Sequence, residues 1–308
     1  MFAAPPSITA EVFARLPDEL RLTDRQSEFI DVHPGHVPKH SLLEGPSFDR
    51  DGNLYCVDIP YGRIFRIDPK GRFEVFVEYD GWPNGLKIHR DGRIFVTDFK
   101  QGIVVIDPVT REVKPYLERV RLEHLKAPND LVFASNGDLY FTDQALTGLQ
   151  DPTGRLYRVR AKGHVDCLLE NIPSPNGVVL DPGEEIVYVA VTRQNAVWRV
   201  PLMRDGGIAK VGVFIQLSGG TGPDGLAMNE HGGLAIAHVG MGAVWLFNKR
   251  GEPVQRINAP EGAHTTNLAY GGPDRKTLYI TESETGTILK AAVDVAGCAM
   301  FSHADSGG

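Results

Sequence analysis

Six oxygen-bearing side chains recur through the sequence at intervals of about 40–48 residues. They are Glu44, Asn84, Asn129, Asn176, Asp224 and Asn267. Carboxylates and amide carbonyls are the ligands that hard divalent cations such as Ca²⁺ prefer. They lack the softness of the thiolates that select zinc. If the fold gathers these residues, they form an oxygen-donor cage for a cation.

A second set of polar residues follows the first, each member 14–16 residues after its partner. Its members are Asp58, Asp98, Asp143, Thr192, His238 and Glu282. Asn-Gly and Asp-Gly are ordinary turn dipeptides. In this chain, however, such pairs precede an apolar run and recur in register. We therefore interpret the first set as a functional ring and the second as a ring around it.

The elements that must position these residues are short strands. In the unit that begins at Asn84, apolar runs at 86–88 and 94–96 flank an Asp-Gly turn, and two further runs follow at 102–107 and 112–118. β-Branched and aromatic residues dominate such runs, as is typical of strands. Four strands in ~40–50 residues, repeated six times, predict an all-β, six-bladed β-propeller with four antiparallel strands per blade.

The last unit lacks a fourth strand, and the N-terminal segment 10–16 resembles the missing one. We expect this N-terminal strand to complete the last blade, because pairing it there removes an exposed sheet edge. The expected organisation is one propeller domain over residues 1–308. Two independent β-sandwiches are the alternative, but they do not explain equivalent polar residues at a fixed place in each unit.

In a propeller the first strand of each blade lines the central channel. The first set of residues is therefore predicted to surround one channel mouth as an inner ring. The second strand returns to the same face, so its last residue belongs to an outer ring. Gathering Glu44 and Asp224 without a cation is costly, because like charges in a partly dry channel repel.

The composition excludes several classes of partner. The formal net charge is −7 and no basic run occurs, which argues against nucleic acid. No apolar run reaches the ~20 residues that span a bilayer. The start of the chain lacks the pattern of a signal peptide, and the three cysteines follow no metal-ligand spacing. We expect a cytoplasmic protein with no membrane partner; the oligomeric state is left open.

Several motifs together resemble the gluconolactonase–regucalcin (senescence marker protein) family, and within it the bacterial lactonases. They are "LLEGPSFD" (42–49), "APNDLVF" (127–133), "PSPNGVVL" (173–180), "GPDGLAM" (222–228) and "TTNLAYGGPDRKTLYIT" (265–281). The similarity extends from about residue 9 to 293. It implies a six-bladed propeller that hydrolyses a lactone, with a small-molecule lactone as its partner.

The resemblance also implies one divalent metal cation, held by Glu44, Asn176 and Asp224, with Asn129 as a further ligand or a substrate contact. Ca²⁺ is preferred, and Mg²⁺, Mn²⁺, Zn²⁺ and Fe²⁺ are alternatives. Relatives that act on sugar lactones often carry an arginine two residues before the position of Asn129, where this chain has Ala127. Nearby Arg119, Arg121 and Lys126 are the available replacements.

Ester hydrolysis develops negative charge on the carbonyl oxygen, which a metal stabilises, and it needs a base for water. We expect Asp224 to be that base, with Asp143 as the second candidate. Asn84, Asn129, His238 and His264 are the candidate substrate contacts, although a neutral histidine there is more often a wall residue. No Gly-x-Ser-x-Gly elbow occurs, so a covalent intermediate is not expected.

Two other functions fit the same residues. A phosphotriesterase-type hydrolase of this fold uses the same cation on a phosphorus centre. A calcium-binding propeller without turnover is the non-enzymatic alternative, because one fold hosts many functions. The sequence does not select the lactone or the native metal.

Overall fold

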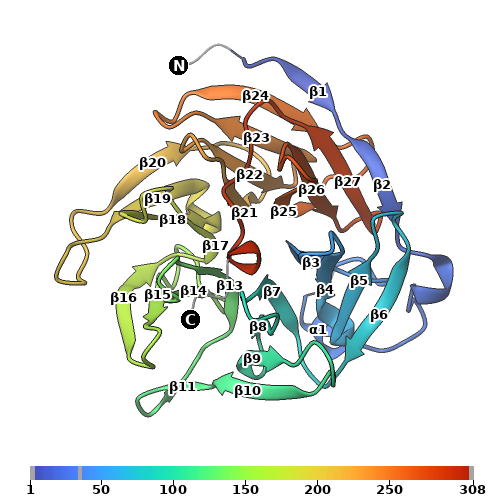
Figure 1. Cartoon of the computed structure of the whole chain (residues 1–308), viewed down its shortest axis with the longest axis horizontal. Coiled ribbons are helices and arrows are strands. Elements are labelled where there is room, and N and C mark those ends of the chain that lie inside the picture. The colour runs from blue at the N-terminus through green and yellow to red at the C-terminus, as the bar shows by residue number, and fades with distance from the viewer. Residues whose placement is uncertain (1–3, 34–36, 305–308) are drawn as a thin grey trace.

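The computed structural model describes residues 4–33 and 37–304, and six sheets radiate from a central channel (Figure 1). In each sheet four strands pair in the antiparallel sense, and they follow chain order from the centre outward except where an N-terminal strand is added at the outer edge of the last two sheets. The predicted six-bladed propeller is thereby confirmed.

The first three blades each contain four consecutive strands of the propeller. Blade 1 consists of β3 (Leu43–Phe48), β4 (Leu54–Asp58), β5 (Arg63–Ile67) and β6 (Phe73–Glu78). Blade 2 consists of β7 (Pro83–Ile88), β8 (Ile94–Asp98), β9 (Gly102–Ile106) and β10 (Val113–Leu117). Blade 3 consists of β13 (Pro128–Phe133), β14 (Leu139–Asp143), β15 (Gly154–Val159) and β16 (Val165–Ile172).

The last three blades follow the same plan, except that the sixth takes its outer strand from the N-terminus. Blade 4 consists of β17 (Pro175–Leu180), β18 (Ile186–Val191), β19 (Ala196–Pro201) and β20 (Gly212–Gln216). Blade 5 consists of β21 (Gly222–Met228), β22 (Leu234–Val239), β23 (Ala243–Phe247) and β24 (Pro253–Asn258). Blade 6 consists of β25 (Thr265–Gly271), β26 (Thr277–Glu282), β27 (Thr287–Ala292) and β2 (Glu11–Arg15).

Helix is confined to short connecting pieces. They are α1 (Glu28–Val32), η1 (Asp18–Leu20), η2 (Ile59–Tyr61), η3 (Thr192–Gln194) and η4 (Phe301–His303). A small hairpin of β11 (Arg119–Val120) and β12 (Glu123–His124) projects between blades 2 and 3. In the part of the chain that the structure describes, no helix is both long and apolar enough to cross a membrane.

The N-terminal strand closes the ring as expected. β2 pairs antiparallel with β27, with Glu11 opposite Lys290 and Arg15 opposite Thr287. The sequence analysis missed a second contribution of the N-terminus, because β1 (Ser7–Thr9) also adds to blade 5 as a parallel partner of β24. The N-terminal segment therefore joins the outer edges of two neighbouring blades, as the blue strand in Figure 1 shows.

The hydrophobic core is divided into clusters that lie between adjacent blades. Val57 and Ile64 of blade 1 pack with Leu86 and Val96 of blade 2. At the closing junction, Leu16 beside β2 packs with residues of blades 6 and 1. Because each blade depends on its neighbours, the inner strands are held rigidly around the channel.

The C-terminal segment crosses the channel at the end opposite to the predicted rings (Figure 1). The Cys298 N–H donates to the carbonyl of Met228 in blade 5, and the Ser302 hydroxyl donates to the carbonyl of Phe48 in blade 1. Phe301 stacks on Phe133 of blade 3 with ring centroids 4.9 Å apart. This segment therefore connects distant blades by hydrogen bonds and stacking, and it covers the channel mouth at which the inner strands end.

Removal of residues 1–17 is expected to expose the edge of β27 and to cause aggregation, while removal of residues 1–9 deletes only β1. Burial of a leucine such as Leu16, which is 2% exposed, contributes about 1.5–3 kcal/mol. The longer deletion should therefore unfold at a clearly lower temperature than the shorter one. Thermal unfolding and size-exclusion chromatography of both variants test this, and a longer deletion that stays monomeric and as stable as the parent contradicts it.

Candidate functional site

Every inner strand has a β-bulge at its inner-ring residue. The register with the second strand shifts between Glu44 and Ser47, Pro83 and Leu86, Pro128 and Leu131, Pro175 and Val178, Pro223 and Leu226, and Thr265 and Asn267. A bulge re-aims side chains and interrupts the alternation of a strand. The six inner-ring residues therefore face a common mouth at the start of the inner strands.

Glycine follows the inner-ring residue in four blades because neighbouring inner strands approach closely there. A Cβ atom on Gly85 would lie 2.7 Å from the carbonyl oxygen of Asn129. A Cβ atom on Gly177 would lie 2.4 Å from the carbonyl oxygen of Asp224. These glycines permit backbone contact between blades, so the Asn-Gly pairs are not hairpin turns.

Hydroxyl groups lock the backbone of the ring across the blade boundaries. Thr142 Oγ1 of blade 3 donates to the carbonyl oxygen of Asn176 in blade 4 at 2.7 Å. Thr266 Oγ1 of blade 6 donates to the carbonyl oxygen of Leu43, just before Glu44, at 2.8 Å. The ring is thus positioned by buried hydrogen bonds between blades as well as within them.

Three carboxylates converge near the mouth at which the inner strands begin, which we call the upper end of the channel. Glu44 and Asp130 are 4% and 2% exposed, and Asp224 keeps partial contact with solvent. Burial raises the pKa of Glu44 well above its usual range, and the charges of Asp224 and Asp130 raise it further. Burial and then the charge of Asp130 also raise the pKa of Asp224. The charges of Asp130 and Asp224 thus make ionisation of Glu44 harder, and that of Asp130 does the same for Asp224, so the site favours a cation.

Asp130 and Lys87 are channel residues that the sequence analysis missed. The Lys87 ammonium lies 3.7 Å from Asp130 Oδ1. Asp130 occupies the position that is glycine in four other units, and this departure from the repeat was the available signal. Lys87 offsets the charge of Asp130, and the charge of Arg193 acts against the rise in the pKa of Asp224.

The amide side chains at the mouth have different partners. Asn267 Nδ2 donates to Glu44 Oε2 at 2.7 Å, and Asn129 Nδ2 donates to Gln144 Oε1 at 2.7 Å. Asn176 Oδ1 is buried and accepts no hydrogen bond within the described residues. A buried amide oxygen without a partner is costly, unless a cation or another donor occupies the space beside it.

The donor set fits a divalent cation of the oxygen-preferring class. Within residues 4–33 and 37–304, no group of three or more His, Cys, Asp and Glu side chains has a metal-binding arrangement, so amide oxygens must complete any coordination. Glu44 and Asp224 supply charge, and Asn176 supplies a buried oxygen that lacks a partner. Asn129 keeps its oxygen available because its nitrogen is already bonded.

The outer ring has a structural role in at least three blades. Asp143 accepts hydrogen bonds from the backbone N–H groups of Lys126 and Ala127, at 3.0 and 2.8 Å, and burial raises its pKa. Asp98 and Glu282 likewise accept backbone N–H groups of nearby loops. Both oxygens of Asp143 are therefore used in holding this loop, whereas Asp224 keeps partial contact with solvent.

The two candidate histidines differ in their surroundings. His238 is 1% exposed, its Nε2 bonds to the carbonyl of Gly219, and its Nδ1 accepts the indole N–H of Trp245. Burial lowers the pKa of His238, so it stays neutral as a wall residue. His264 is half-buried and its backbone N–H donates to Glu282. His264 is the freer of the two for a substrate contact.

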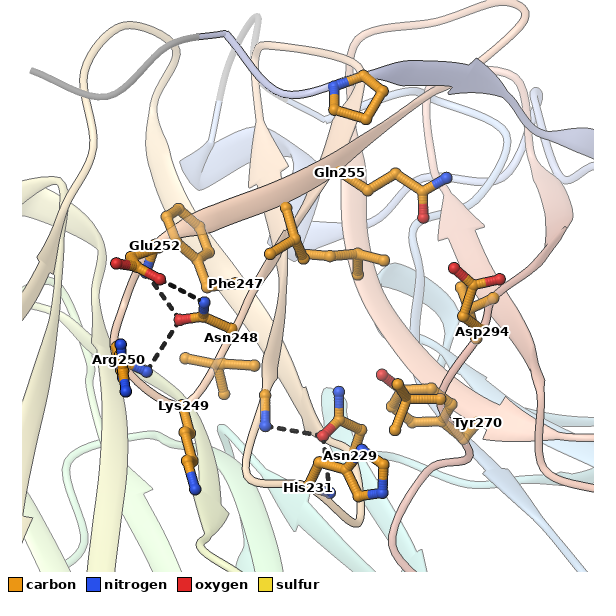
Figure 2. Close-up of a pocket in the computed structure, with 17 residues that line it drawn as sticks. Asn229, His231, Phe247, Asn248, Lys249, Arg250, Glu252, Gln255, Tyr270 and Asp294 are labelled. Atoms are coloured by element: carbon orange, nitrogen blue, oxygen red, sulfur yellow. Dashed lines mark hydrogen bonds between the residues drawn. The ribbon is translucent and has the colours of Figure 1, made fainter.

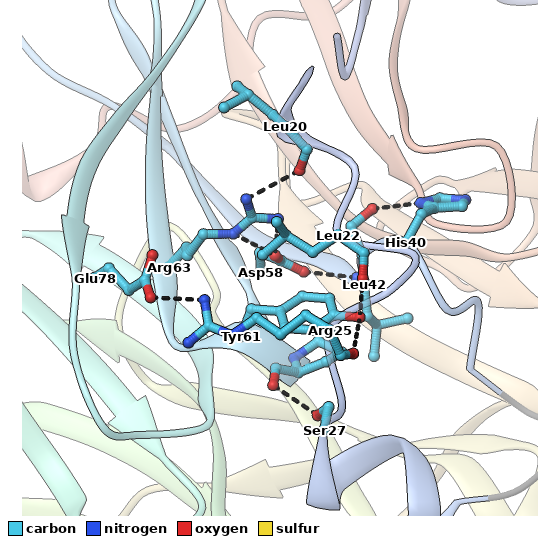
Figure 3. Close-up of polar contacts among 12 residues, drawn as sticks. Leu20, Leu22, Arg25, Ser27, His40, Leu42, Asp58, Tyr61, Arg63 and Glu78 are labelled. Atoms are coloured by element: carbon cyan, nitrogen blue, oxygen red, sulfur yellow. Dashed lines mark hydrogen bonds and ion pairs between the residues drawn. The ribbon is translucent and has the colours of Figure 1, made fainter. Parts of the chain in front are cut away.

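The segment before blade 1 is anchored beside the mouth by a buried ion pair (Figure 3). Arg63 Nη2 lies 2.6 Å from Asp58 Oδ2, and Arg63 also donates to the carbonyl of Leu20. Burial raises the pKa of Asp58 to about 6, against the lowering effect of Arg63. The Tyr61 hydroxyl donates to the carbonyl of Leu22 at 2.7 Å. The approach to the mouth on this side is therefore fixed.

A large cavity lies away from both rings. Its volume is about 710 Å³, and side chains of blades 5 and 6, including Asn229, Phe247, Tyr270 and Asp294, line it (Figure 2). None of its lining residues belongs to the inner or the outer ring. Its polar groups bond locally, as in the pair of Asn248 Nδ2 and Glu252 Oε2 at 2.6 Å. We therefore assign the candidate site to the channel mouth.

Comparison with known proteins decides the family. The SMP-30/Gluconolactonase/LRE-like region matches residues 42–284. This chain belongs to that family. Lactonase drp35 of Staphylococcus aureus (strain MRSA252) is 34% identical over 254 residues, 78% of this chain and 77% of the relative. The resemblance recognised from the motifs is thus confirmed.

Solved structures of the family share the fold. A calcium-binding protein, regucalcin, from Agrobacterium tumefaciens aligns over 97% of this chain and 98% of its own, with a TM-score of 0.76 and 25% identity. A gluconolactonase from Xanthomonas campestris aligns over 95% of this chain and 97% of its own, with a TM-score of 0.74 and 20% identity. The second likeness shows the fold alone.

The position that departs from the sugar-lactone members of the family is buried in the wall of blade 3. Ala127 is 8% exposed, and its backbone bonds to Asp143 and Gln144. Of the replacement cations, Arg119 and Arg121 lie on the exposed hairpin, and Lys126 Nζ donates to Thr153 Oγ1. The structure therefore directs no arginine or lysine from this loop toward Asn129.

Gly85→Ala is expected to destabilise the protein, because the new methyl group meets backbone and carboxylate atoms of Asn129 and Asp130 at 2.7 Å. Overpacking of this kind costs about 1–3 kcal/mol. Gly212→Ala in β20 is the matched control, because a Cβ there meets nothing within 4 Å. Denaturant unfolding measures both free energies, and equal stability of the two variants contradicts close packing at the ring.

Proposed function

We propose that this protein is a metal-dependent lactonase that opens a cyclic ester at the upper channel mouth. The observation that carries the proposal is the convergence of Glu44, Asp130 and Asp224 beside the unpaired oxygen of Asn176. The name of its relative, lactonase drp35, and that of its family, SMP-30/Gluconolactonase/LRE-like region, support the reaction class. The calcium-binding relative supports Ca²⁺ as the preferred cation.

In this proposal Glu44, Asn129, Asn176 and Asp224 hold one divalent cation. When bound, the cation supplies a Lewis acid that polarises the ester carbonyl. Asn267 orients Glu44 through its hydrogen bond, which leaves the other carboxylate oxygen for coordination. Asn84, at the same ring, and His264, at the mouth, are the proposed contacts for the polar groups of the substrate.

Asp224 is the proposed base because it alone among the three carboxylates is partly exposed to solvent. It accepts a proton from the water whose oxygen bonds to the acyl carbon. The bond between the acyl carbon and the ring oxygen then breaks, and the proton passes from Asp224 to that oxygen. Lactone and water give one hydroxy acid, so atoms and charge balance without a covalent enzyme intermediate.

A non-catalytic calcium-binding protein is the second candidate function, which the calcium-binding relative favours. A phosphotriesterase-type reaction at the same cation is the remaining alternative. A cytoplasmic location stays part of the proposal, consistent with three cysteines that form no disulfide. Proton release from a lactone panel and from a phosphotriester, with and without EDTA, separates these functions, because calcium binding without turnover yields no protons.

Asp224→Asn and Glu44→Gln are expected to lose at least a hundredfold in affinity for Ca²⁺ and most lactone turnover, because each removes a charged ligand at nearly constant volume. Asn267→Ala should lose less, about 10–100-fold, since groups that orient a ligand have that weight. Isothermal titration with CaCl₂ and assays on gluconolactone measure both. Equal loss in all three variants, accompanied by lower unfolding temperatures, points to destabilisation and contradicts the assignment.

Broad substrate acceptance is expected because Ala127 replaces the arginine of sugar-lactone relatives. A buried donor matched to a substrate hydroxyl discriminates strongly, whereas an apolar wall gives only ~10–200-fold per methylene. Values of kcat/KM for D-glucono-δ-lactone, γ-butyrolactone and dihydrocoumarin should lie within about tenfold of each other. A preference of a thousandfold for the sugar lactone contradicts this expectation and indicates another donor at the mouth.

A further inference from the structure

We propose that Gln144 is a positioning residue that selects which atom of Asn129 faces the channel, and thereby sets the affinity of the site for its cation. The inference rests on the proposed function, because it takes Asn129 to be a metal ligand. Nothing in the sequence pattern of the rings marks Gln144, which follows the outer-ring residue Asp143.

The contacts form a directed chain of hydrogen bonds. Asn129 Nδ2 donates to Gln144 Oε1 at 2.7 Å, and Gln144 Nε2 donates to Ser174 Oγ at 2.9 Å. Asn129 is 5% exposed, so its amide has few alternative partners. Because the nitrogen and the oxygen of a planar carboxamide lie on opposite sides of its Cβ–Cγ axis, the bond from Nδ2 to Gln144 turns Oδ1 to the other side, which in this proposal faces the cation.

The surrounding loop holds Gln144 in place. The backbone N–H of Gln144 donates to the carbonyl of Ala127 at 3.0 Å, and Thr147 Oγ1 donates to the carbonyl of Gln144 at 2.6 Å. The backbone N–H of Ser174 in turn donates to Thr147 Oγ1 at 3.2 Å. Side chain and backbone of Gln144 are therefore fixed from both sides, before any ligand binds.

Two non-glycine residues at this loop adopt left-handed backbone conformations. Ala145, next to Gln144, has φ of 49°, and Ser174, its acceptor, has φ of 65°. Such conformations cost about 1–3 kcal/mol and persist where the surrounding structure enforces them, often at functional sites. Ser174 lies two residues before Asn176, so the same chain of bonds connects two of the four proposed ligands.

The other blades lack an equivalent of Gln144. The residue after the outer-ring position is Ile59, Phe99, Arg193, Val239 or Ser283 in those blades. Of these, Ser283 donates to the backbone carbonyl of Leu43. A long carboxamide is thus found at this position only in blade 3, beside the proposed ligand Asn129; in blade 4, whose Asn176 is also a proposed ligand, the position holds Arg193.

Titration of purified protein with CaCl₂ tests the proposal in Gln144→Leu and Gln144→Glu, with Gln101→Leu as the control. Gln144→Leu should weaken binding by about 10–100-fold, the usual effect of removing a group that orients a ligand. Gln144→Glu should bind within about threefold of the parent, because a carboxylate still accepts from Asn129 Nδ2 and from the Ser174 hydroxyl. Gln101 donates to the backbone carbonyl of Asp80 in the connection between blades 1 and 2, so its variant should bind as the parent does.

A double-mutant cycle separates positioning from general damage to the loop. In Asn129→Asp the two carboxylate oxygens are equivalent, so their direction no longer depends on residue 144. Adding Gln144→Leu to Asn129→Asp should therefore change Ca²⁺ affinity by less than about threefold. If Gln144→Leu weakens Ca²⁺ binding as much in Asn129→Asp as it does in the parent protein, Gln144 acts only through loop structure and the proposal is overturned.

The remaining outcomes are also decisive. Unchanged Ca²⁺ affinity in Gln144→Leu overturns the proposal, as does a Gln144→Glu variant as weak as Gln144→Leu, because the amide of Gln144 then donates to Asn129. Lactone turnover measured in parallel keeps the proposed function separate. If Gln144→Leu loses Ca²⁺ affinity while the parent protein opens no lactone, the positioning role stands and the lactonase assignment falls. A parent protein without affinity for Ca²⁺ overturns both.

Discussion

The mutual repulsion of three carboxylates in the upper channel is the constraint on which the rest of the site depends. Glu44, Asp130 and Asp224 come from three different blades. The charges of Asp130 and Asp224 raise the pKa of Glu44, and the charge of Asp130 raises that of Asp224. Lys87 offsets part of this charge from blade 2. The negative charge that Lys87 does not offset destabilises the folded state locally, and close-packed, hydrogen-bonded strands keep the carboxylates together against this repulsion.

The propeller provides that restraint through contacts between blades. Glycines at the mouth let the backbones of adjacent inner strands touch, and threonine hydroxyls bond across the boundaries. Each blade therefore fixes the ring residue of the next one, and the last junction closes through β2. A rigid ring of donors is what selective cation binding requires, since flexible ligands relax around ions of any size.

The sequence revealed the repeat because apolar runs, turns and polar ring residues return at nearly constant spacing. It placed Glu44, Asn176 and Asp224 at one mouth for the same reason. It failed at Asp130 because strict alternation sends the neighbour of a channel residue to the opposite side. The bulge at Pro128–Leu131 breaks that alternation and turns two consecutive side chains toward the channel. Gln144 and the C-terminal segment were missed because their contacts join residues with no local pattern in common.

The pairing of β2 with β27 also governs when the molecule can become complete. Glu11 is synthesised 279 residues (290 − 11) before Lys290, yet the two are opposite each other in the finished sheet. At 5–20 residues per second, the ribosome needs roughly 14–56 s to make the residues between them. Throughout that time the outermost strand of blade 6 has no partner, so the ring closes only after the last blade has been made. The nascent chain must therefore remain soluble with an open edge for far longer than a strand needs to pair.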